Sequence, residues 1–226
     1  MMIAMIGAAL LTVGASPDAG RQAFFDPGIS DRGVACATCH EASPEEDTDG
    51  LIRAGHSLFD VARRPHWRGD VRRSSLPTVR AAMEPCIEIY MGGLRTKDDG
   101  ALIARFLEQN VGTGKAPPAL VIKPSLEADR DYARPKYLSG DPDRGRKLYY
   151  RACHSCHPHG DKEGIAGRVA GLDRARVAAN VREGTGLLRG RRDPAAWMAF
   201  FGADRLSDDE VADIAAFVEG LGAKAR

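Results

Sequence analysis

The stretches "CATCH" (Cys36–His40) and "CHSCH" (Cys153–His157) decide the fold of this 226-residue chain. Each has the C-x-x-C-H pattern of c-type haem attachment, in which two thiols form thioethers with the vinyl groups of the haem. Cysteines three residues apart lie on one face of a helical turn, and the next residue can present its imidazole to the iron. The sequence therefore predicts two covalently bound c-type haems. The attachment residues are Cys36, Cys39, Cys153 and Cys156, and the iron ligands beside them are His40 and His157.

A zinc ion bound between the two C-x-x-C pairs is the alternative interpretation. We favour haem because zinc would leave the histidine that follows each pair unexplained. The formal charge of the chain is +1, and the haem propionates would make the loaded protein mildly acidic. Nucleic-acid-binding domains usually carry a basic excess, so the composition does not indicate a nucleic-acid partner. The length favours two domains of roughly 100 residues each.

The N-terminal segment "MMIAMIGAALLTVGASPDAG" (Met1–Gly20) has the features of a secretory signal. Its apolar run is too short to span a bilayer, and small residues that suit cleavage follow it. No Lys or Arg precedes the run, so an uncleaved membrane anchor remains the alternative. We expect residues 1–15 to be a signal peptide and the mature protein to be periplasmic. After signal removal, no stretch is long and apolar enough to cross a membrane.

The two halves of the chain repeat one scheme. In each, a helix with aromatic residues precedes the haem motif, and an amphipathic helix closes the half, "ALIARFLEQN" (101–110) in the first and "DIAAFVEGL" (213–221) in the second. Between them, residues 113–138 are rich in proline and weakly periodic, as expected of a linker on the surface. The sequence therefore predicts an all-α fold. Two tandem domains, 20–112 and 139–226, would each wrap around one haem.

The second half resembles class I cytochrome c. Beyond "CHSCH", the segment "DPAAWMAFFGADRLSDDEVADIAAFV" (Asp193–Val218) is similar to the methionine loop and C-terminal helix of that family, and the resemblance covers most of Gly140–Leu221. It implies that Met198 is the second axial ligand of the second haem. A thioether ligand raises the reduction potential of haem iron. The alternative is that Met198 only fills the core, as methionine often does.

The axial ligand of the first haem is less obvious. Aligning the closing helices of the two halves puts Ile87 opposite Met198, and isoleucine cannot bind iron. On an uninterrupted helix, Met83 and Cys86 differ by about 60° and Cys86 and Met91 by about 140°, so they cannot all face one iron. The candidates that remain open are Cys86, Met91 and Met83, or His56 or His66 in a bis-histidine haem.

A second resemblance favours the cysteine. "GVACATCH" (33–40) followed by "VARRPHWRGDVRRSSLPTVRAAMEPCIEIYMGG" (61–93) resembles the haem domain of di-haem thiosulfate dehydrogenases and of Sox thiosulfate-oxidising cytochromes. The resemblance covers roughly residues 20–110 and implies that Cys86 is the distal haem ligand. Tyr90 departs from it, because the dehydrogenases have a serine shortly after their cysteine. The implied arginine-rich stretch, which could hold an oxyanion through forked hydrogen bonds, falls on Arg68, Arg72 and Arg73.

These ligands predict a direction of electron flow. Thiolate ligation lowers the potential of haem iron and methionine raises it, so electrons would enter at the Cys86 haem and leave through the Met198 haem. We therefore predict an electron-transfer protein whose partners are other periplasmic redox proteins. The alternative from the resemblance is an enzyme that oxidises thiosulfate or a related sulfur anion at Cys86. A di-haem peroxidase is a third possibility, because "FFDPGISDRGVACATCH" (24–40) also resembles those domains.

Overall fold

The computed structural model describes residues 17–223 except 46, 70, 121, 123, 159, 161–164 and 186–197, so the predicted signal peptide lies outside the described residues. The described chain is mostly helical, which confirms the predicted all-α class. Two short strands, β1 (His66–Trp67) and β2 (Val71–Arg72), pair antiparallel, with His66 opposite Arg72. The α-helices are α1 (Pro17–Phe25), α2 (Cys36–Cys39), α3 (Val79–Ile89), α4 (Lys97–Gln109), α5 (Pro135–Leu138), α6 (Pro142–Ala152), α7 (Arg174–Glu183) and α8 (Asp208–Ala223). Short 3₁₀ turns cover Pro27–Ile29, Val61–Arg63 and Arg73–Ser75.

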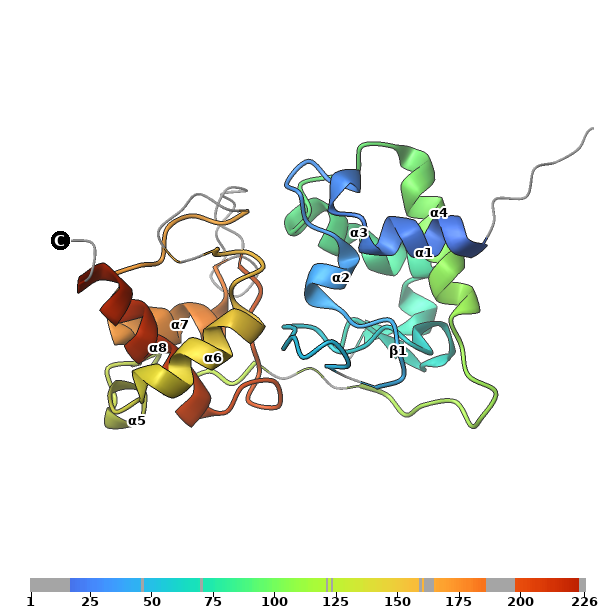
Figure 1. The fold of residues 1–226 in the computed structure, drawn as a ribbon. Coiled ribbons are helices and arrows are strands. Elements are labelled where there is room, and N and C mark those ends of the chain that lie inside the picture. Colours follow the sequence, from blue (N-terminus) through green and yellow to red (C-terminus); the bar gives the residue numbers. More distant parts are fainter. Residues whose placement is uncertain are drawn as a thin grey trace, which may run out of the picture.

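Helices α1 to α4 gather on one side of the molecule, and α5 to α8 on the other (Figure 1). In the first group α1 packs across α4, and α3 packs beside them. Threonines begin α3 and α4, because the side chains of Thr78 and Thr96 accept hydrogen bonds from backbone amides of the first turns. The core that these helices share includes Phe24, Ile29, Trp67, Ile87, Met91, Ile103 and Leu107.

In the second group α6 crosses α8 at close range. A Cβ atom at Gly145 would overlap the backbone of α8 at Asp213, and one at Gly140 would overlap it at Ala212. Glycine at both positions therefore lets the two backbones approach, since it has no side chain. The core around this crossing includes Tyr137, Tyr149, Cys153, Val177, Leu206, Val211 and Ile214.

The stretch predicted as a surface linker contributes to this second core at its C-terminal end. Tyr132 and Tyr137 are 4% and 0% exposed, and α5 packs against α8. The hydroxyl of Tyr137 donates to Glu127 over 2.8 Å. Aromatic burial thus ties residues 127–138 to the second group of helices. Among the described residues, no helix has the length and apolar character needed to cross a membrane.

Candidate functional site

The loop that follows the first haem motif orients His40. The ring Nδ1 of His40 donates to the backbone carbonyl of His56 over 2.8 Å. This bond selects the tautomer that carries its lone pair on Nε2, the form that an iron ligand needs. Gly55 lies against the same ring, and a Cβ atom there would overlap the imidazole. The predicted ligand is therefore held by the His56 carbonyl and by close contact with Gly55.

We expect Gly55→Ala to disturb the first haem site. The added methyl group must displace the imidazole of His40, and overpacking of this kind costs about 1–3 kcal/mol. The low-spin signal of the first haem should weaken in the EPR spectrum. Gly167→Ala is the matched control, because the Gly167 carbonyl accepts from His157 Nδ1 over 3.0 Å and nothing lies within 4 Å of a Cβ built there. Equal disturbance by both substitutions would contradict the proposed role of Gly55.

A cavity of about 480 Å³ lies between α2 and α3. Cys36, Cys39 and His40 line one wall, so both thiols and the imidazole of the first motif face the same space. The rest of the wall is largely apolar. Two thiols, an imidazole and an apolar enclosure match what a c-type haem requires. The side chains of α3 and the turn after it that line the cavity are Val79, Ala82, Met83, Pro85, Cys86, Ile87, Tyr90 and Met91.

Cys86 lies close to both attachment cysteines. Burial raises the pKa of the Cys86 thiol, and the positive charge of Arg68 partly opposes the rise. Burial also raises the pKa of Cys36 to about 12, and the neighbouring Cys86 adds to it. A thiol that burial keeps protonated in the protein alone would lose its proton to ferric iron, because the metal charge stabilises the thiolate.

The two methionine candidates also reach the cavity, although an uninterrupted helix could not aim all three side chains at one point. The reason is that α3 ends at Ile89, and the Met91 amide then donates back to the Cys86 carbonyl over 3.3 Å. This turn brings Met91, 4% exposed, to the cavity wall. His56 and His66 line the cavity as well. The described residues that line the cavity therefore include every candidate axial ligand that the sequence left open.

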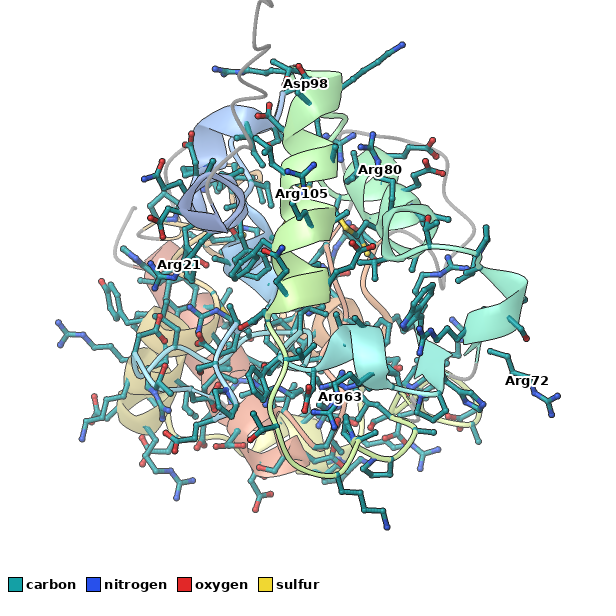
Figure 2. The ribbon with its side chains drawn as sticks, turned by 90° about the vertical axis from the view of Figure 1, so that its right-hand side faces the viewer. Arg21, Arg63, Arg72, Arg80, Asp98 and Arg105 are labelled. Carbon is teal, nitrogen blue, oxygen red and sulfur yellow. The ribbon has the colours of Figure 1, made fainter. Side chains whose placement is uncertain are left out.

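The three arginines of the predicted anion site lie apart. Arg68 lines the cavity at the first motif and has a backbone φ of 45°, in the left-handed region that non-glycine residues seldom adopt. Arg72 is exposed and projects away from the body of the protein (Figure 2). Arg73 lies over the Trp67 ring, 5.6 Å from its centroid. Arg72 and Arg73 line a separate surface hollow, and of the described residues that line it only His66 also lines the cavity at the first motif.

The second motif has the same local design as the first. His157 Nδ1 donates to the Gly167 carbonyl, and burial lowers the pKa of the imidazole. Burial favours the neutral ring, and the bond to the Gly167 carbonyl partly opposes the fall in pKa but keeps the proton on Nδ1, so Nε2 is the electron-pair donor. The Tyr149 hydroxyl donates to the backbone carbonyl of His157. Cys153 is 9% exposed and belongs to the second core.

Met198 packs against the core that contains Cys153. Its amide donates to Thr185 Oγ1 over 2.7 Å, and its carbonyl accepts from the Thr185 amide over 3.1 Å. Gly184, with a φ of 63°, ends α7, and a Cβ atom there would meet the Met198 carbonyl. The end of α7 therefore fixes the backbone of Met198.

One cysteine of the first motif, Cys39, is influenced by one of the second, Cys156. Burial raises the pKa of Cys39 to about 12, and the neighbouring Cys156 contributes to the rise. Two residues of the second half, Ala199 and Phe200, line the first cavity directly after Met198. Sequence reasoning missed this sharing because it treated the halves as separate. Among the described residues, no group of three or more His, Cys, Asp or Glu side chains is placed to hold a metal ion.

The comparisons with known proteins bear on the second half. A family model described as "Cytochrome C oxidase, cbb3-type, subunit III" matches residues 140–218, a range that contains the second haem motif and Met198. A search of the curated proteins finds no match to the chain. Covalently bound haem and electron transfer are general properties of cytochrome c domains. Residues 140–218 are therefore similar to a c-type cytochrome domain, which supports covalent haem and electron transfer for this half of the chain.

Proposed function

We propose that the chain is a periplasmic di-haem c-type cytochrome that transfers electrons between redox partners. The observation that carries the proposal is the cavity at the first motif, where two thiols and an imidazole face candidate axial ligands on α3. The shared design of the two motifs supports it, since each histidine donates through Nδ1 to a backbone carbonyl. Residues 20–112 would hold the first haem and residues 139–226 the second.

In this proposal Cys86 is the distal ligand of the first haem and Met198 that of the second. The proximity of Cys86 to Cys36 and Cys39 supports the first assignment. The second assignment is supported by the bond from the Met198 amide to Thr185 Oγ1 and the bond from the Thr185 amide to the Met198 carbonyl. A thiolate lowers and a thioether raises the potential of haem iron, so the Cys86 site would accept electrons and the Met198 site would pass them on.

Oxidation of thiosulfate or a related sulfur anion is the second candidate function. Arg68 favours it, because its charge acts on the Cys86 thiol and its backbone is held in the left-handed region. Non-glycine residues in that region often occur at functional sites, where the surrounding structure tolerates the strain. Arg68 would hold the anion beside the sulfur of Cys86.

Two measurements test these functions. A pyridine haemochrome assay should find two covalent haems per chain, and one haem would contradict the main proposal. Thiosulfate is then added to the oxidised protein, and haem reduction is followed optically. Reduction that is lost in Arg68→Ala but kept in Arg72→Ala would establish the sulfur activity. A protein that thiosulfate does not reduce is an electron carrier without this activity.

A further inference from the structure

Residues 47–56, here called the junction loop, hold the first haem motif. The His56 carbonyl accepts from His40, as described above. Arg53, buried to 6% exposure, donates through Nε to the Ala37 carbonyl inside the motif over 2.8 Å. Its Nη1 donates to Glu41 over 2.9 Å. The loop therefore fixes both the backbone of the motif and the imidazole that follows it.

The same loop holds the chain just before the second motif. The Ile52 amide donates to the Arg151 carbonyl over 3.0 Å, and Arg151 Nε donates to the Gly50 carbonyl over 2.7 Å. Arg151 lies two residues before Cys153 in the sequence. Ile52 is 7% exposed and belongs to the core of the second half. A loop of the first half of the chain thus contributes to the core of the second half.

A third set of contacts joins the loop to the segment after Met198. Arg205 Nε donates to the Arg53 carbonyl over 2.8 Å, and its Nη2 pairs with Asp47 over 2.9 Å. The His56 Nε2 lies 2.7 Å from Asp204 Oδ2. The Arg205 side chain is only 8% exposed, so water cannot easily replace these partners.

We propose that the junction loop locks the two haem motifs into one rigid electron-transfer pair, and that Arg205 is the positioning residue that closes it. The inference rests on the proposed function, because it requires both motifs to carry haem. The nearness of Cys39 to Cys156 and the position of Ala199 and Phe200 in the first cavity agree with it.

The test compares Arg205→Ala with Arg174→Ala in the haem-loaded protein. Arg174 makes a similar pair of contacts, to Glu219 and to the Leu138 carbonyl, but both partners lie in the second half. Removing a hydrogen bond that involves a buried charged group shifts an equilibrium about tenfold or more. Arg205→Ala should therefore raise the population of separated halves by at least about tenfold, whereas Arg174→Ala should not.

Two readouts follow this separation. The first is EPR relaxation of the first ferric haem, measured with the second haem ferric and again with it ferrous. The wild type and Arg174→Ala should show faster relaxation when both are ferric, and Arg205→Ala should lose most of the difference. The second is calorimetry, where one unfolding transition should split into two in Arg205→Ala.

The outcomes separate the two proposals. A single haem per chain contradicts the proposed function itself. Two haems whose relaxation and unfolding are the same in Arg205→Ala and the wild type overturn the junction alone. If Arg205→Ala does not fold, Asp204→Ala replaces it, since that carboxylate is 56% exposed and its described side-chain contact is the one with His56. Coupling equal to the wild type in Asp204→Ala would then count against the junction.

Discussion

Cys86→Ala should abolish a low-spin thiolate signal in the EPR spectrum of the ferric protein and leave a second signal, from a His/Met haem, in place. The alanine cannot bind iron, so the first haem loses the electron-donating ligand that lowers its potential. Axial ligands set haem potentials over a span of about 0.8 V, and we expect the first potential to rise by on the order of 100 mV. Redox titration of both haems measures the shift.

The controls for this substitution are Met83→Leu and Met91→Leu. Both side chains line the same cavity as Cys86, and leucine keeps similar volume without a sulfur donor. If Cys86 is the ligand, neither control removes the thiolate signal. A signal of the His/Met type that disappears in Met91→Leu and survives in Cys86→Ala would assign the first haem to Met91 and remove the basis for sulfur chemistry.

The haem motifs and the helices that close each half could be predicted from the sequence, because a five-residue motif and helical periodicity are local signals. The position of Met91 could not be predicted from local signals. The sequence left Met91 open as a ligand, and its place on the cavity wall depends on α3 ending at Ile89 and on the turn that follows. Where a helix ends, the side chains that follow take new directions. No glycine occurs between the start of α3 and Met91, so the sequence carries no glycine signal for this helix end.

The junction loop could not be predicted for a different reason. Its contacts use backbone carbonyls of Gly50, Arg53 and His56 as acceptors, and a carbonyl has no signature in the sequence. The charged residues of the junction loop are of the kind that usually occur in solvent-exposed loops. The burial of Tyr132 and Tyr137, in contrast, could have been predicted, because two tyrosines within a proline-rich stretch indicate packing into a core.

Met198→Ala should convert the second haem from His/Met ligation to ligation by a weaker donor or to five coordination. The ferric absorption band of methionine-bound iron should disappear, and the potential of this haem should fall by on the order of 100 mV, since the thioether that raises it is gone. The potential difference between the Cys86 site and this haem should shrink by the same amount, so electron transfer from the first haem to the second should slow. Stopped-flow reduction of the oxidised protein, with the absorption of each haem followed separately, measures this.

Thr185→Val tests the same assignment more gently. It removes the hydroxyl that accepts from the Met198 amide but keeps the methionine itself, so the absorption band should weaken or become sensitive to temperature without vanishing. Thr185 touches no other candidate ligand in the described contacts, which makes the two substitutions a graded pair. Should Met198→Ala keep the band and the potential of the wild type, Met198 is a core side chain, and the ligand must come from another residue of the second half.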